Sequence, residues 1–252
     1  MEPKVTVLMP VYNGAAFVGM AIESILKQTF KEFEFLIIDD GSTDNSLEII
    51  RFYEDSRIRL VMNEENLGLA ASLNRGISLS KGKYIARMDC DDISLPKRLA
   101  DQVEFMDNHP FVGACGTNGL CIDEDDKIIR TSSWCPEDGV PLEWLLLWDT
   151  VLAHPTVMLR KTTLMEHNLA YRNVPAEDKD LWCRLVLKAK IARLPQMLFH
   201  YRERRGSSYN GCKDKHVRQA IQSGSGLVRA ITHQEVPPFY SELTVYPYIV
   251  GY

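Results

Sequence analysis

The chain has 252 residues, 45% of them hydrophobic and 25% charged, which is in the range where one compact α/β domain can bury a sizeable core. A formal net charge of −5 disfavours a nucleic-acid-binding protein, because binding to phosphates needs clustered Lys and Arg that this balance does not supply. The sequence shows no secretory leader pattern and no apolar run of the roughly 18 residues that a membrane span needs, so we expect a cytoplasmic protein.

The first half of the chain, to about residue 110, alternates short β-branched or aromatic runs with segments of helical periodicity. This alternation is typical of a parallel sheet with crossover helices. The predicted strands, each ending in turn residues or acids, cover residues 5–9, 33–38, 58–62 and 84–88. We expect all of them to run parallel. Three predicted helices have recognisable starts, at Asn13, at Thr43 or Asp44, and at Pro96.

The second half is less regular. It begins with two short apolar runs, LCI and KIIR, that flank the acidic turn DEDD, and this pattern predicts a hairpin. A strand at 156–160, a helix at 177–189 and a strand near 198–202 follow. Because no convincing linker divides the chain, we interpret residues 1–110 and 111–212 as two halves of one α/β domain, with residues 213–252 as a C-terminal extension.

Paired acids follow two of the predicted strands, in the strings IIDDGSTD and MDCDD. Ligands of open parallel sheets bind beyond the carboxyl ends of the strands, so these acids are candidates for a site. Carboxylates of the first string could accept hydrogen bonds from a nucleotide, and those of the second could bind Mg²⁺ or Mn²⁺ together with substrate phosphates. The same strings could also be only a capped turn and an acidic loop before a helix. The residues alone leave both interpretations open.

Five strings in order resemble the inverting family 2 glycosyltransferases, which have the GT-A fold. They are VTVLMPVYNGAAFVGMAIESILKQTF, FEFLIIDDGSTDNS, NLGLAASLNRGISLSKGKYIARMDCDDISLPKRL, AHPTVMLRK, and AEDKDLWCRL with YRERRGSS. The resemblance runs from Val5 to about Ser208. It implies a Rossmann-like, mostly parallel central sheet flanked by helices, with a smaller mixed or antiparallel part on the acceptor side. Residues 1–110 would bind the nucleotide-sugar, and residues 111–212 would bind the acceptor and carry the catalytic base.

On the nucleotide side, the resemblance implies contacts from the end of the first strand and from the DDGS string. Pro10, Val11 and Tyr12 would lie beside the base. Asp40 would contact the base, and Asp39 beside it is a further candidate for nucleotide binding.

In the MDCDD string, the resemblance implies that Asp91 binds the divalent metal, Mn²⁺ or Mg²⁺, and that Asp89 lies near the ribose or the donor sugar. Cys90 would lie between them in the nucleotide-sugar site as a spacer. Near the end of the matching region, Arg204 stands where family members commonly have His. It would either bind the diphosphate as a fixed cation or remain a solvated charge.

The catalytic base of the family falls on Asp178, which opens the predicted helix 177–189. From the residues alone, Glu177 and Asp178 could merely complement a helix N-terminus. Asp180 lies two positions further on and points elsewhere, so it is the less suitable base. His154 resembles a family position near the acceptor, but a hydrogen-bonded structural His fits it equally well.

The resemblance as a whole implies an enzyme that moves one sugar, expected to come from a UDP-sugar, to a saccharide or lipid-linked acceptor in cell-surface polysaccharide or glycoconjugate synthesis. The QxxRW string of processive synthases is absent from the sequence, which favours single addition. The basic stretch 202–218 could contact the inner face of the membrane peripherally, or form only a solvated face. The alternative is a non-catalytic relative that binds nucleotide-sugars as a sensor or complex subunit.

Overall fold

One curved sheet of nine strands runs through the part of the chain that the computed structural model describes, namely residues 2–132, 142–146, 151–204 and 213–232. Its strands are β1 (Val5–Val11), β2 (Phe33–Asp39), β3 (Ile58–Met62), β4 (Tyr84–Arg87), β5 (Ile93–Ser94), β6 (Val112–Ile122), β7 (Ile128–Ser132), β8 (Met158–Arg160) and β9 (Lys190–Arg202). The helices are α1 (Val18–Leu26), α2 (Ser46–Arg51), α3 (Leu69–Leu79), α4 (Arg98–Asn108), α5 (Leu142–Leu145), α6 (Lys161–Glu166), α7 (Glu177–Leu185) and α9 (Lys213–Thr232), with a 3₁₀ turn η1 (His154–Thr156).

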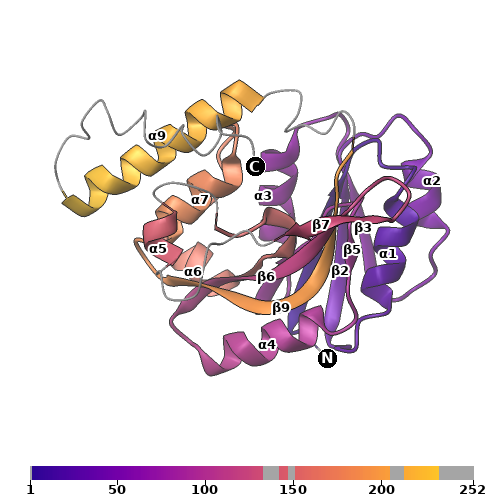
Figure 1. The fold of residues 1–252 in the computed structure, drawn as a ribbon. Coiled ribbons are helices and arrows are strands. Elements are labelled where there is room, and N and C mark those ends of the chain that lie inside the picture. The colour runs from indigo at the N-terminus through magenta and orange to yellow at the C-terminus, as the bar shows by residue number, and fades with distance from the viewer. Residues whose placement is uncertain (1, 133–141, 147–150, 205–212, 233–252) are drawn as a thin grey trace.

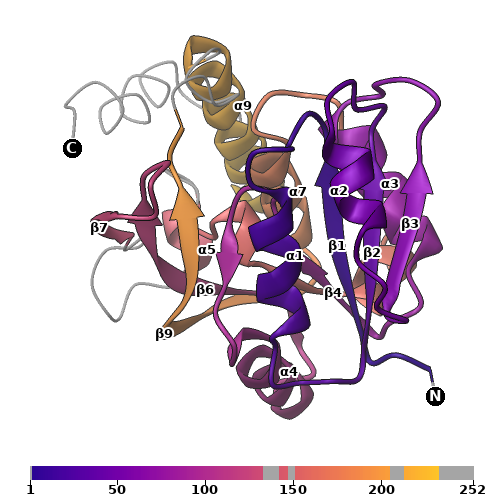
Figure 2. The ribbon, with the colours of Figure 1, turned by 90° about the vertical axis from the view of Figure 1, so that its right-hand side faces the viewer.

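The four strands of the first half lie in the order β3, β2, β1, β4 and all run parallel, as predicted. Every residue of β1 and β2 is buried, because helices cover both faces of these strands. Val5, Val7 and Met9 pack into one apolar cluster with α1 and α4. Leu8 between them joins a second cluster with α3 and α7 on the opposite face. Figure 2 shows α1 in front of these strands and α3 behind them.

The second half extends the sheet with mixed pairing. β8 lies antiparallel between β4 and β6, and β6 forms the predicted hairpin with β7. β9 pairs parallel with β6 and antiparallel with the short β5. The sheet is therefore parallel on one side and mixed on the other, which confirms the predicted fold class.

Several predicted boundaries were wrong. β9 begins at Lys190 rather than near residue 198. The strand can continue through Pro195, which has no N–H to donate, because its register with β6 shifts between Leu194 and Met197. The helix α7 ends at Leu185 instead of continuing to 189, and β8 begins only at Met158 after η1.

Two of the predicted helix starts also differ in detail. Asn13 does not begin α1; it has a positive φ of 51° in the preceding turn, and its side-chain oxygen accepts a hydrogen bond from the Thr43 backbone N–H at 2.8 Å. Pro96 lies two residues before α4, and the Leu99 backbone N–H donates to the Gln28 side chain at 3.0 Å. The two helix ends are thus tied to neighbouring segments instead of being capped by their own residues.

The C-terminal extension contains the helix α9, which lies along the outer side of α7 (Figure 1). Its Ala220 and Leu227 are buried, and Leu227 packs into the same cluster as Trp182 of α7. None of the helices in the described ranges combines the length and the apolar character that crossing a bilayer requires.

Candidate active site

The acids that follow β2 and β4 lie at one edge of the sheet, because both strands pair parallel with β1 and end at the same side. Asp39 is the last residue of β2 and lies opposite Val11 of β1. Tyr12, the residue that follows β1, is about half exposed (48%), whereas Pro10 and Val11 are buried within the strand. Pro10, Val11, Tyr12 and Asp39 therefore lie together at the end of β1, and the ring of Tyr12 is the exposed one among them.

Asp40 is buried and holds the loop that follows β3. Its Oδ1 accepts hydrogen bonds from the Leu67 backbone N–H at 3.0 Å and from the Asn63 side-chain amide. Its Oδ2 accepts from the Gly68 backbone N–H at 2.9 Å, where a φ of 87° requires glycine. In contrast, Oδ1 of the neighbouring Asp39 is buried with no hydrogen-bond partner among the described residues. This edge thus has one carboxylate committed to the protein and one with an open acceptor atom.

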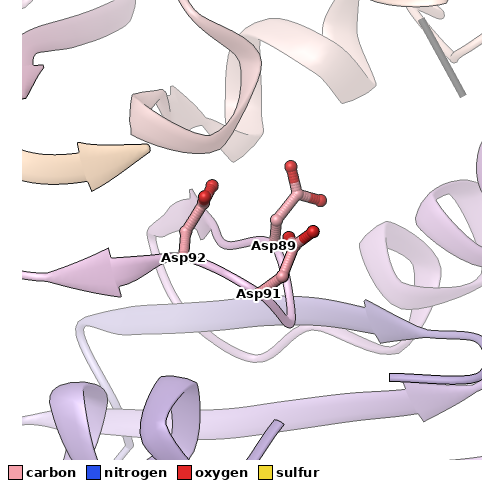
Figure 3. A group of neighbouring side chains, drawn as sticks. All are labelled: Asp89, Asp91 and Asp92. Atoms are coloured by element: carbon pink, nitrogen blue, oxygen red, sulfur yellow. The ribbon is translucent and has the colours of Figure 1, made fainter. Parts of the chain in front are cut away.

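Three carboxylates gather in the loop after β4. Oxygen atoms of Asp89, Asp91 and Asp92 all lie within 4.8 Å of one another, and Figure 3 shows their side chains rising from the same side of the loop. Asp92 is almost fully buried; its Oδ1 accepts a hydrogen bond from the Arg202 backbone N–H at 2.7 Å, and its Oδ2 has no such partner in the described ranges.

Burial and mutual repulsion make the negative charges of this cluster unfavourable. Burial raises the pKa of Asp92 well above its ordinary value, and the charges of Asp89 and Asp91 raise it further. Burial and Asp89 also raise the pKa of Asp91, although Arg204 and Arg87 partly oppose the shift. An additional cation would relieve this repulsion, and Mg²⁺ and Mn²⁺ prefer carboxylate oxygens such as these. The residues present therefore fit a divalent metal.

Two arginines form ion pairs with the cluster. Arg204, which the family resemblance associates with the nucleotide-sugar site, approaches Asp91 with 2.6 Å between Nε and Oδ2, and its guanidinium lies over the ring of Phe17 at 5.7 Å. Arg87, the last residue of β4, is buried and forms an ion pair with Asp89. Cys90 points differently: its Sγ would lie 2.8 Å from a Cβ at Gly14, and its side chain packs against the apolar cluster under α1.

Asp178 lies in the first turn of α7, directly after Ala176 and Glu177. Ala176 adopts a left-handed conformation with φ 51°, which aims the start of the helix. Burial raises the pKa of Asp178, and the charge of Glu177 contributes to the increase while His154 opposes it. Asp180 is instead paired with Arg184 at 2.6 Å, which is a structural contact.

His154 is buried in a hydrogen-bonded network beside Asp178. Its Nε2 lies 2.8 Å from the Tyr171 hydroxyl and its Nδ1 lies 3.4 Å from Oε1 of Glu177. Burial, reinforced by the charge of Arg87, lowers the pKa of His154 to about 3, so the ring is neutral at physiological pH. A neutral ring with its proton on Nδ1 can interact favourably with Glu177 and accept from Tyr171. Of the two interpretations of His154, a residue near the acceptor or a hydrogen-bonded structural histidine, this geometry corresponds to the second.

Arg87 connects the two halves of the site. Its charge acts on Asp89 after β4 and also on His154, Tyr171 and Asp178 in the second half. Asp178 and the acidic cluster, which are some 90 positions apart in the sequence, thus belong to one electrostatic environment.

Sequence reasoning missed the third carboxylate and the buried arginines. Asp92 was visible in the MDCDD string but was not assigned as a ligand, because a strand-end acid can equally enter a turn. Arg87 and Arg202 stand within predicted strands, where nothing in the local pattern distinguishes a buried arginine from an exposed one.

Residues 6–173 match the model of the glycosyl transferase family 2, which covers well over half of the chain, so the protein belongs to this family. The protein EpsE of Bacillus subtilis (strain 168), whose name assigns it provisionally as a glycosyltransferase, is 39% identical over 188 residues, or 72% of this chain and 66% of EpsE. MJ1057 of Methanocaldococcus jannaschii, named an uncharacterized glycosyltransferase, is 32% identical over 206 residues, or 80% of this chain and 71% of that relative. The chain thus spans just under two thirds of EpsE.

Solved structures of similar shape confirm the GT-A fold. TarS 1–349 of S. aureus in complex with UDP-GlcNAc matches with a TM-score of 0.74 and 19% identity, covering 98% of this chain and 71% of that one. The mannosyltransferase PcManGT from Pyrobaculum calidifontis, in complex with GDP-Man and Mn²⁺, matches with a TM-score of 0.66 and 17% identity, covering 100% of this chain and 81% of that one. At these identities the likeness concerns the fold alone.

Proposed function

We propose that this chain transfers one sugar from a nucleotide-sugar, expected to be a UDP-sugar, to a hydroxyl of a saccharide or lipid-linked acceptor, with inversion at the anomeric carbon. The observation that carries this proposal is the joint environment of the acidic cluster and Asp178 around Arg87. The nucleotide-sugars named with TarS and PcManGT support the donor class. The proposed role is in the synthesis of cell-surface polysaccharide or glycoconjugates, on the cytoplasmic side of the membrane.

The donor would bind along the edge formed by β1, β2 and β4. The base would lie against Tyr12, whose ring is exposed, with the unpartnered Oδ1 of Asp39 accepting from its N–H groups or from ribose hydroxyls. Asp40 would contact the base through the second lone pair of Oδ2, because its other hydrogen bonds go to the loop 63–68. Asp89 would hold the donor sugar. Pro10, Val11 and Cys90 would shape the site through the backbone and through packing, since their side chains are largely buried.

Asp91 would hold Mn²⁺ or Mg²⁺, with Asp92 as a further carboxylate within reach. Such a metal supplies positive charge that stabilises the diphosphate as it leaves. Arg204, which already lies at Asp91, would add a fixed positive charge toward the same phosphates. Of the two interpretations of Arg204, this proposal takes the fixed cation, because its guanidinium lies beside Asp91 and over the ring of Phe17.

Asp178 would act as the general base. As the acceptor oxygen forms its bond to the anomeric carbon, the bond from that carbon to the diphosphate breaks, and the electron pair leaves with the nucleoside diphosphate. The proton of the acceptor hydroxyl passes to the Asp178 carboxylate. A raised pKa makes this carboxylate a stronger base than an exposed aspartate. One carboxylate suffices, because the diphosphate does not need the protonation that a sugar leaving group needs in glycoside hydrolysis.

The test is a comparison of binding and transfer in matched variants. Asp178→Asn is expected to lose at least about a hundredfold in transfer, the lower range for general-base catalysis, while UDP binding in the presence of Mn²⁺ persists. Asp101→Asn, which also removes an acid from a helical first turn but lies in α4, should keep full activity. Asp91→Ala should abolish the gain in UDP affinity that Mn²⁺ provides.

Donor hydrolysis or transfer to simple sugars can be followed by release of UDP from a panel of UDP-sugars. Equal turnover by Asp178→Asn and wild type would remove Asp178 from the mechanism. Nucleotide-sugar binding with neither transfer nor slow hydrolysis would favour the non-catalytic relative, a sensor or complex subunit.

A further inference from the structure

The last residue of β9, Arg202, joins three segments that are far apart in the sequence. Its Nε donates to the backbone carbonyl of Asp91 at 2.7 Å, and its own backbone N–H donates to Asp92 at the same distance. Its Nη1 donates to the backbone carbonyl of Asp123 at 2.7 Å, and its Nη2 pairs with the carboxylate of Asp126 at 2.6 Å. The side chain has no solvent exposure, and its guanidinium lies over the ring of Phe17 at 4.5 Å.

The other end of this arrangement, the turn 123–127 between β6 and β7, is itself well fixed. Oδ1 of Asp123 accepts hydrogen bonds from the backbone N–H groups of Asp125 and Lys127, each at 2.9 Å. Asp126 has a positive φ of 64°, so its carboxylate is presented from a constrained backbone. The turn therefore offers Arg202 a firm point of attachment some 30 positions away from the acidic loop.

We propose that Arg202 is a positioning residue that sets the direction of the metal-binding carboxylates by bracing the backbone of Asp91 against the turn 123–127. The inference rests on the proposed function, in which Asp91 holds a divalent metal. A guanidinium suits this task because its planar fork fixes several acceptors at once, whereas an ammonium does not. Removing a residue that orients a metal ligand without touching the metal typically lowers the metal affinity about 10- to 100-fold.

The geometry assigns Arg202 an indirect role. The hydrogen bonds of its guanidinium go to protein groups, and its burial leaves no room for it to face a substrate. The consequence is that Asp126, a half-exposed residue of a turn and not a ligand, should influence the affinity for a metal held in another loop.

The experiment measures the dissociation constant of Mn²⁺ alone, by the electron paramagnetic resonance signal of the free ion, for four variants of the full chain. Arg202→Lys and Asp126→Asn are each expected to raise it about 10-fold. The double variant should bind no more weakly than the weaker single variant, because both changes release the same brace. Asp125→Asn is the matched control, since Asp125 is an exposed neighbour in the same turn and should leave the constant within about twofold.

Unchanged Mn²⁺ binding in Asp126→Asn would overturn the inference, as would an equal effect of Asp125→Asn, which would indicate only the loss of charge near the site. Additive effects of Arg202→Lys and Asp126→Asn would also contradict a shared brace. If Arg202→Lys fails to fold, the exposed pair Asp126→Asn and Asp125→Asn decides alone. Failure of the wild-type chain to bind Mn²⁺ would instead overturn the metal site of the proposed function, and the brace with it.

Discussion

Asp178 carries a charge that its surroundings disfavour, and this should be measurable as a cost in stability. Its pKa in the folded chain is raised by burial and by Glu177, above the value of about 3.9 expected in an unfolded chain. The folded state therefore holds the proton more tightly than the unfolded state. Stability gained from this group increases as the pH falls toward the raised pKa and is lost at neutral pH, where the carboxylate is ionised.

Asp178→Asn should consequently melt at a higher temperature than wild type at pH 7, although it is expected to be inactive. The difference should shrink as the pH is lowered toward the raised pKa, because the wild-type carboxyl becomes protonated while the amide does not change. Thermal melts of both proteins between pH 5 and 8 check this. A variant that is less stable than wild type at pH 7 would mean that the Asp178 charge is compensated in the folded chain.

At this scale, the sequence indicated which acids matter but not how they are used. The strings IIDDGSTD and MDCDD were enough to predict acids at one sheet edge, because parallel strands that pair with β1 must end together. The separation of roles between Asp39 and Asp40 was not predictable, since it depends on the loop 63–68 that returns to Asp40. The burial of Arg87 between the two halves was not predictable either, because it depends on how the halves pack and not on a local sequence pattern.

Among the elements, two helical glycines offer a matched pair. Gly76 of α3 faces β1 so closely that a Cβ would lie 2.1 Å from Leu8 Cδ1, whereas a Cβ at Gly226 of α9 would meet nothing within 4 Å. Both glycines cost the same helix propensity, up to about 1 kcal/mol relative to Ala. We expect Gly76→Ala to destabilise the fold by about 1–3 kcal/mol through overpacking, and Gly226→Ala to stabilise it slightly.

Urea denaturation of the two variants measures these changes against wild type. Because the substitution is chemically identical in both helices, opposite signs would isolate the packing of α3 on β1. Equal stabilisation by both would show that Leu8 can move aside without cost.

The end of α4 is tied to the starts of β1 and β4 by Asp107. Its carboxylate pairs with Lys4 at 2.6 Å and Lys83 at 2.8 Å, and accepts a hydrogen bond from the Tyr84 hydroxyl at 2.7 Å. Burial alone would raise the pKa of Asp107, but these three partners hold it well below its ordinary value. A depressed pKa means that the stabilisation is present above about pH 4 and is lost as the pH falls further.

Asp107→Asn is therefore expected to lower stability by about 1 kcal/mol at pH 7, a modest value because the group is partly solvated. The difference from wild type should fade as the pH is lowered from 5 to 3, because in this range the unfolded chain binds a proton at this carboxyl while the folded chain, with its depressed pKa, does not. Denaturation midpoints across this range test the prediction. A difference that persists at pH 3 would point to the Tyr84 hydrogen bond, which an amide can still accept, or to packing rather than to charge.

The elements of the first half were predicted to within one or two residues at most strand ends, because β-branched runs between helical segments are a strong local pattern. The second half was predicted less well for a physical reason. β9 is 13 residues long, but Pro195 and Gln196 lie within it at the irregularity opposite β6, so its sequence reads as two short pieces. A strand that bends in this way is specified by its partner and not by its own periodicity.

Across the whole molecule, each of the two apolar clusters contains residues from both halves of the chain, 1–110 and 111–212. One cluster contains Val7 and Met9 of β1 together with Phe199 of β9. The other contains Leu8 of β1 together with Trp182 of α7 and Leu227 of α9. Each face of the sheet is thus covered by residues from both halves. We expect residues 1–110 and 111–212 to unfold together, since neither half has a core of its own.

Leu227→Ala tests this coupling from the far end of the chain. Leu227 is 2% exposed, so the truncation should cost about 2–4 kcal/mol, whereas Ile231→Ala on the same helix, at 57% exposure, should change stability by no more than about 0.5 kcal/mol. Two temperatures are compared between Leu227→Ala and wild type: the midpoint of the tryptophan fluorescence transition and the temperature at which UDP binding is lost. If the clusters act as one core, the substitution lowers both temperatures by the same amount. At 25 °C, well below that transition, its UDP affinity should equal that of wild type. Fluorescence that changes while UDP binding is still intact would instead show that α7 and α9 separate from β1–β4 before those strands unfold. Asp178 would then belong to a part of the molecule that can open independently.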